Sequence, residues 1–387
     1  MTIFDLPALD PAEALTLARA TLAAHPVLIR IYDEPFIVNL IRRKGAYDNI
    51  LLLRLVQPDD EMNAEYWTQM TDDLLTLESE GSFDAFRAKL REHEGPAVER
   101  NRTELLIAAW LKRRGVTIAL EPQVGTRKCE FVAETTPRSW WEIKSPLDLP
   151  DLRRDAEVQT DVHRRLRSID QPYILGLAKY ELAIGQVPEA VKEIKRQLYA
   201  FHRAGGMPPR VFEAKGLVIS VDGLTKRPKG YLGSMMSKPH MFGNEQPAHI
   251  VKRILDAVDQ IPAEGGGVVV IDQTSTDWID HEDVVNACYG EEQTVIRGGQ
   301  WLNCRLPGAF DDLSIARVSA VVSYTRRWRD DNDKQPKITL LHNPNALFTL
   351  PPNFLDYEDV QHTRRVAERN GFRLVTMPDD EGTRGRV

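Results

Sequence analysis

The chain has 387 residues, of which 42% are apolar and 28% charged, and its formal net charge is −7. This mixture is typical of a globular protein with one large α/β domain or two ordinary domains and a sizeable core. The acidic balance argues against a protein coated with phosphate-binding groups, although a local basic face can coexist with an acidic remainder.

Cysteine usage and the apolar runs restrict the class further. The three cysteines, Cys129, Cys288 and Cys304, form no CxxC or CxxxC pair, so neither a disulfide framework nor a structural zinc site is predicted. The apolar run GVVVI is far shorter than the roughly 20 residues that span a bilayer, and the first ten residues lack a basic start followed by an apolar block. We therefore expect a cytoplasmic protein with no membrane partner.

The first 115 residues show the spacing of helices. Apolar residues recur three and four positions apart in segments 11–25, 66–80, 83–94 and 100–115. Segment 29–57 mixes periods and fits either a helix or a pair of strands. Gly115 is a plausible helix stop.

After Gly115 the pattern changes to strands and then to an alternation of helices and strands. Segments 116–124, 128–134 and 139–145 read as three successive strands, with a turn at 135–137. Further helices are predicted at 152–169, 188–204 and 249–261, and further strands at 173–178, 216–222, 267–273, 316–325 and 337–343. The loops at 222–247 and 272–312 are long. The alternation predicts an α/β fold with a mixed central sheet flanked by helices.

The turn at 135–137 fixes a hairpin register. It pairs Glu134 with Arg138, and it sets Glu130 opposite Glu142 with their Cβ atoms about 5 Å apart. Two like charges in directly opposed positions destabilise a sheet unless something compensates them.

A divalent cation held by oxygen ligands would compensate the two glutamates. Because side chains alternate along a strand, Lys144 shares the face of Glu142 and would point at the same ion-bound water or phosphate. The alternative is that these residues are solvated on an exposed strand, where Lys144 partly neutralises the acids. The flanking Trp-Trp and Ile, the acid on the preceding helix and the basic helix that follows favour a site.

The order of these residues resembles the PD-(D/E)xK nuclease superfamily, which has the restriction-endonuclease-like fold. Glu104 in the helix RNRTELLIAAWLKRRG matches the helix acid of the family, Glu130 in KCEF matches the first hairpin acid, and Glu142-Ile143-Lys144 matches the (D/E)-x-K motif. The specific resemblance covers about residues 95–180. Together with the residue pattern it predicts a helical extension over 1–95, a nuclease domain with a C-terminal sheet extension over 96–350 and a charged tail over 351–387.

The resemblance also implies roles for the matched residues. Glu130, Glu142 and the backbone carbonyl of Ile143 would ligate Mg²⁺ or Mn²⁺, which activates a water and stabilises the transition state. Lys144 would orient or deprotonate that water. The usual first hairpin acid of the family is Asp, so Glu130 leaves three alternatives: an intact site with a shifted backbone, a preference for Mn²⁺, or a dead site.

Two further residues are weaker candidates. Glu104 would hold a second metal or a metal-bound water, and its alternative role is in a capping box with Asn101 or Thr103. Gln159 would support the site from the helix after the hairpin, as a glutamine does in some related nucleases, although a glutamine on a charged helix is more often merely solvated.

Basic residues on two helices are candidates for contact with nucleic acid, because phosphate contacts supply affinity that does not depend on sequence. Acidic residues between the arginines of the second helix leave a solvated, internally paired face as the alternative. The candidates are Lys112, Arg113 and Arg114 on the first helix and Arg153, Arg154, Arg164, Arg165 and Arg167 on the second.

The function predicted from this resemblance is metal-dependent hydrolysis of phosphodiester bonds, with a DNA endonuclease as the first expectation. Cutting two strands would favour a homodimer, and analogy of fold alone suggests defence against foreign DNA. The alternatives are a degenerate nuclease fold that serves as a nucleic-acid-binding or assembly module, and a ribonuclease.

Overall fold

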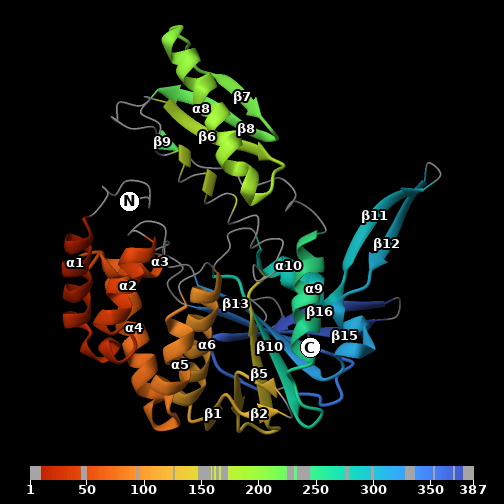
Figure 1. The fold of residues 1–387 in the computed structure, drawn as a ribbon. Helices are drawn as coiled ribbons and strands as arrows, with labels where there is room; N and C mark the ends of the chain where they lie inside the picture. The colour runs from red at the N-terminus through yellow and green to blue at the C-terminus, as the bar shows by residue number, and fades with distance from the viewer. Residues whose placement is uncertain are drawn as a thin grey trace. The chain divides into compact units, whose positions relative to one another are not determined.

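A computed structural model (Figure 1) describes residues 10–44, 50–92, 96–124, 127–146, 158, 161–162, 165–166, 173–224, 231–232, 245–274, 279–297, 300–326, 336–351, 354–368 and 371–377. The chain divides into two compact units. Unit 1 comprises Leu149–Gly243 together with Met1–Ala8, and unit 2 comprises Leu9–Asp148 and Asn244–Val387.

Unit 2 begins with a helical region (Figure 1). Its α-helices are α1 (Pro11–Ala24), α2 (Glu34–Lys44), α3 (Ile50–Leu55), α4 (Glu61–Thr76), α5 (Ser82–Leu90) and α6 (Pro96–Arg113). Asp10 and Asp60 cap α1 and α4, where their carboxylates accept hydrogen bonds from backbone N–H groups of the first turn. In the segment of mixed period, 29–57, the described residues include the helices α2 and α3 and no strand.

A mixed eight-stranded sheet follows, in the order β1-β4-β5-β10-β13-β14-β15-β16. The strands are β1 (Ile118–Leu120), β4 (Phe131–Ala133), β5 (Ser139–Lys144), β10 (Gly266–Asp272), β13 (Val318–Thr325), β14 (Lys337–His342), β15 (Val360–Glu368) and β16 (Gly371–Met377). β10 runs parallel to both β5 and β13. Before β4, the short strands β2 (Gln123–Val124) and β3 (Arg127–Lys128) form a separate hairpin.

Each face of this sheet carries a core. Trp141, Val270 and Val322 pack with the N-terminal helices. Trp140 and Val269 lie in a second core with residues of α9 (Glu245–Val258) and α10 (His281–Tyr289). The prediction of a mixed sheet with helices on both faces is confirmed for this unit.

Unit 1 has its own sheet, in the order β7-β8-β6-β9. Its strands are β6 (Tyr173–Tyr180), β7 (Arg210–Ala214), β8 (Leu217–Leu224) and β9 (Tyr231–Leu232), and its helix α8 spans Val187–Arg203. α8 buries Val191, Ile194 and Leu198 in a core formed with β6 and β8. The strands predicted at 173–178 and 216–222 therefore belong to a second sheet and not to the central one.

Two segments form more regular structure than expected. The predicted loop at 272–312 contains α10 and the antiparallel hairpin β11 (Glu291–Arg297) and β12 (Gln300–Leu306). Residues 351–387, for which the sequence predicts a charged tail, contribute β15 and β16 to the large sheet. None of the helices in the described ranges is both long and apolar enough to cross a membrane.

Candidate functional site

The β4–β5 hairpin has the register predicted from its turn. Val132 pairs with Trp140, and the adjacent pairs are Phe131 with Trp141 and Ala133 with Ser139. At the turn, Arg138 forms an ion pair with Glu134 at 2.6 Å.

This register brings Glu130, Glu142 and Lys144 to one place. The backbone N–H of Glu130 donates a hydrogen bond to Oε1 of Glu142 at 3.1 Å, and Lys144 Nζ lies 3.1 Å from Oε2 of Glu142. The Glu142 side chain is fully buried. Burial raises the pKa of Glu142 and the charge of Glu130 adds to the rise, while the Lys144 ammonium opposes it.

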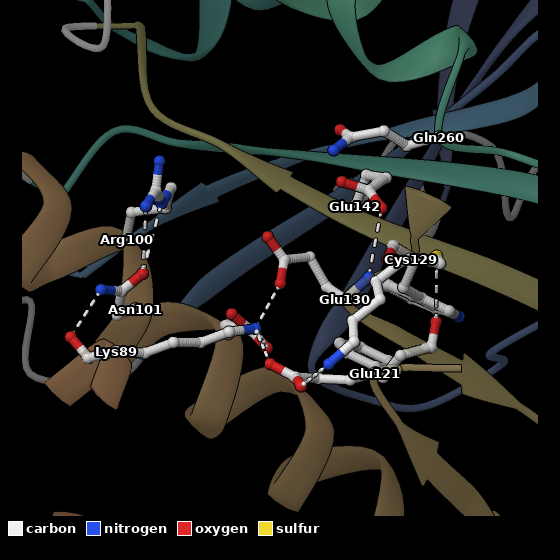
Figure 2. A network of polar contacts seen from close by, with 12 residues as sticks. Lys89, Arg100, Asn101, Glu121, Cys129, Glu130, Glu142 and Gln260 are labelled. Carbon is white, nitrogen blue, oxygen red and sulfur yellow. Dashed lines mark hydrogen bonds and ion pairs between the residues drawn. The ribbon is translucent and has the colours of Figure 1, made fainter. Parts of the chain in front are cut away.

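A lysine that no sequence motif marks, Lys89, lies among the acids. Lys89, at the end of α5, places its Nζ 2.7 Å from Oε1 of Glu104, 2.5 Å from Oε2 of Glu130 and 3.2 Å from Oε1 of Glu121. Figure 2 shows the Lys89 side chain reaching from its helix toward the glutamates. The negative charges of Glu104 and Glu130 outweigh the effect of burial and raise the pKa of Lys89.

The two acids nearest Lys89 differ in pKa. Burial, followed by the charge of Glu130, raises the pKa of Glu104 well above its ordinary value. Burial also acts to raise the pKa of Glu130, but the Lys89 ammonium, hydrogen bonds from Lys89 and Glu104, and the charge of Lys144 together lower it. At a given pH, Glu104 is therefore protonated more readily than Glu130.

The capping-box role considered for Glu104 is wrong, because α6 begins at Pro96 and both Asn101 and Thr103 lie inside the helix. The side chain of Asn101 instead donates a hydrogen bond from Nδ2 to the backbone carbonyl of Lys89 at 2.7 Å. α6 thus holds the end of α5 in place while it presents Glu104 to the Lys89 ammonium.

A glutamine other than the expected one supports Lys144. Gln260, which follows the last turn of α9, accepts a short hydrogen bond from Lys144 Nζ through Oε1. Gln159 lies outside the described residues. The thiol of Cys129, next to Glu130, donates to the carbonyl of Trp141 at 3.1 Å, and burial raises its pKa.

The basic candidates in unit 2 are all engaged within the protein. Ion pairs join Lys112 to Glu80 at 2.5 Å, Arg113 to Asp73 at 2.7 Å and Arg114 to Asp359 at 2.6 Å. In unit 1, Arg165 pairs with Asp161 at 2.8 Å. Arg153, Arg154, Arg164 and Arg167 lie outside the described residues. Contact of these groups with phosphate stays a prediction.

The carboxylates have the right chemistry for Mg²⁺ or Mn²⁺, but their arrangement does not fit a metal ion. The ammonium of Lys89 lies within 3.2 Å of three of them, which leaves those oxygens engaged by a cation of the protein itself. Within the described ranges, no group of three or more His, Cys, Asp or Glu side chains is placed to hold a metal ion. The roles in metal binding expected for Glu104 and Glu130 have no support from these contacts. Those expected for Glu142 and the Ile143 carbonyl stay predictions.

Comparison of the chain with protein-family profiles, curated proteins and solved structures finds no significant match.

Proposed function

We propose that this chain is a nuclease that hydrolyses phosphodiester bonds at the β4–β5 hairpin, with DNA as the first expected substrate. The observation that carries the proposal is the contact of Lys144 with Glu142 on β5, beside the backbone of Glu130. The order of elements supports it. Around this hairpin the elements of unit 2 come in the order α6, β1, β4, β5, α9 and β10, with the short β2–β3 hairpin between β1 and β4 and the residues of unit 1 between β5 and α9. In the sheet, β5 and β10 are parallel neighbours.

The side chains on β5 suit a reaction at phosphate. Lys144 is held from two sides, by Glu142 and by Gln260, so its ammonium can bind a phosphate oxygen or orient a water without first being ordered. Burial raises the pKa of Glu142, which brings this carboxyl closer to the range in which it exchanges a proton near neutral pH.

Cleavage of plasmid, linear DNA and RNA with Mg²⁺ or Mn²⁺ tests the proposal. Glu142→Gln and Lys144→Met keep the shapes of the side chains and remove the charges. Loss of either group from a general acid–base mechanism should slow cleavage by about 10²-fold or more. Glu134→Gln is the matched control, because Glu134 lies in the same hairpin and pairs only with the exposed Arg138 among the contacts described above. Cleavage at the wild-type rate in both site variants refutes the proposal.

The second candidate is a nucleic-acid-binding or assembly module that keeps the fold without turnover. It is favoured by the ammonium of Lys89 among the acids and by glutamate at position 130, where the family has aspartate. The same substrate panel, read by gel shift as well as by cleavage, separates the two: retardation of DNA or RNA without any cleavage supports the module.

A further inference from the structure

We propose that Lys89 is the resident counter-cation of this acidic cluster and that it competes with divalent ions for the carboxylates. The inference concerns the site named under the proposed function, and its bearing on catalysis rests on that function. Lys89 lies where the sequence predicts a metal ion, in contact with two of the expected ligands, Glu104 and Glu130.

The contacts of Lys89 use its full donor capacity. An ammonium has three N–H donors, and Nζ of Lys89 has Glu104, Glu121 and Glu130 within ion-pair distance. The acceptor on Glu130 is Oε2, one of the two carboxylate oxygens through which this residue could bind a metal ion. A metal ion and the Lys89 ammonium therefore compete for the same lone pairs.

The backbone at Lys89 and the residues that follow it are held by other parts of unit 2. Asn101 binds the carbonyl of Lys89 itself. Two residues further on, Arg91 donates from Nε to the carbonyl of Ile31 at 2.6 Å and pairs with Asp33 at 2.5 Å. The Lys89 side chain is only 21% exposed. The ammonium is therefore positioned by the fold and differs from a free surface lysine that happens to meet an acid.

The charge balance of the cluster leads to the same conclusion. The cluster contains four carboxylates and three ammonium groups. Besides Lys89, the ammonium groups are those of Lys128, which pairs with Glu121 at 3.0 Å, and Lys144, which pairs with Glu142. The carboxylates are those of Glu104, Glu121, Glu130 and Glu142. At most one negative charge is left uncompensated. A divalent ion would reverse the sign of the cluster unless an ammonium left, so its binding carries the cost of breaking the contacts of Lys89.

Calorimetric titration of the full chain with Mn²⁺ tests the inference. Lys89→Met removes the charge and keeps the length of the side chain. Because two like charges at this range repel strongly at a partly buried site, we expect Lys89→Met to bind Mn²⁺ at least about tenfold more tightly than wild type. Lys215→Met, which removes an exposed lysine paired with Glu189 in unit 1, should bind Mn²⁺ as wild type does.

A second pair of variants covers loss of folding. Lys89→Met leaves Glu104 buried without its partner, so Lys89→Met/Glu104→Gln removes both charges and should also bind Mn²⁺ more tightly than wild type. Lys89→Met/Glu130→Gln should not bind Mn²⁺ more tightly than wild type, because the carboxylate oxygen that Lys89 leaves free belongs to Glu130. Circular dichroism establishes which variants are folded.

The outcomes separate this inference from the proposed function. If no folded variant that lacks Lys89 binds Mn²⁺ more tightly than wild type, the competition does not exist, whatever the cleavage assay shows. If Mn²⁺ binding tightens on removal of Lys89 but neither wild type nor variant cleaves nucleic acid, the counter-cation role stands and the nuclease proposal fails.

Discussion

Asp272, the last residue of β10, is a fully buried carboxyl at the end of an inner strand of the large sheet. Its Oδ1 accepts a hydrogen bond from the backbone N–H of Thr274 at 3.0 Å, while Oδ2 has no hydrogen-bond partner. Burial raises its pKa from 3.8 to about 6, against the backbone hydrogen bond from Thr274. The ionised form of Asp272 is therefore a source of instability in the folded protein near neutral pH.

We predict that Asp272→Asn stabilises the protein at high pH. The folded pKa lies above the unfolded pKa, so the contribution of Asp272 to stability is present below pH 3.8 and is lost as the pH rises through about 6. The loss amounts to about 3 kcal/mol, because each tenfold change in a protonation equilibrium corresponds to about 1.4 kcal/mol. Urea unfolding should show the variant more stable than wild type at pH 8 and equal to it at pH 4. A difference that does not change with pH would contradict this assignment.

At the scale of single residues, the sequence could predict Glu130, Glu142 and Lys144 but not their partners. Those three lie in one hairpin, where the turn and the alternation of side chains fix which positions meet. Lys89 is 41 residues from Glu130, and Gln260 is 116 residues from Lys144. Both long-range contacts depend on how helices pack on the sheet. A lysine near the end of an amphipathic helix reads as solvated unless that packing is known.

At the scale of elements, the β4–β5 hairpin is anchored by an aromatic pair. The rings of Phe131 and Trp141 stack with centroids 5.6 Å apart and planes 15° from parallel. Trp141 also donates from Nε1 to the hydroxyl of Ser139 at 2.9 Å. Because Glu142 follows Trp141 directly, this packing holds the backbone that presents the candidate site.

We predict that Trp141→Ala lowers the free energy of unfolding by about 3–5 kcal/mol, since it empties a large volume in a fully packed core. Trp141→Phe should cost less, because it keeps a ring against Phe131. The measurement is urea unfolding followed by far-ultraviolet circular dichroism. A loss below about 1 kcal/mol for Trp141→Ala would show that the hairpin does not depend on this stack.

Element boundaries show where sequence patterns mislead. Asn and Thr are common caps, which favours a helix start near Asn101. Pro96, a residue favoured in the first turn of a helix, marks the beginning of α6 instead. β15 contains the charged residues Arg364, Arg365 and Glu368, so its sequence does not read as a strand, although it pairs with both β14 and β16. Charge alone is an unsafe reason to expect a tail there.

At the scale of the whole molecule, each unit has a core of its own. Strand periodicity identifies β6 and β8 as strands, but it contains no information on which strands they pair with. The sequence therefore predicts that they belong to the central sheet, whereas in the structure they form a second sheet with β7 and β9. The seven tryptophans, at positions 67, 110, 140, 141, 278, 301 and 328, all lie outside residues 149–243. Tryptophan fluorescence therefore reports on unit 2 only.

We predict that Leu198→Ala destabilises unit 1 without changing unit 2. Leu198 is fully buried in the core of unit 1, and its truncation should cost about 2–5 kcal/mol there. Hydrogen exchange measured by mass spectrometry should become faster in α8 and its sheet, while the urea midpoint of tryptophan fluorescence stays at the wild-type value. A shift of that midpoint would show that the two units unfold together.

The residues of unit 1 separate the two neighbouring strands at the middle of the large sheet. Ser139 on β5 pairs with Gly266 on β10, and the whole of Leu149–Gly243 is synthesised between them. At the usual speed of translation this interval is roughly 6 to 25 s. During that time the nascent chain carries β5 with one edge open to unwanted association. Early folding of unit 1 on the ribosome would shorten the flexible chain between the two strands and lower the entropy cost of closing the sheet.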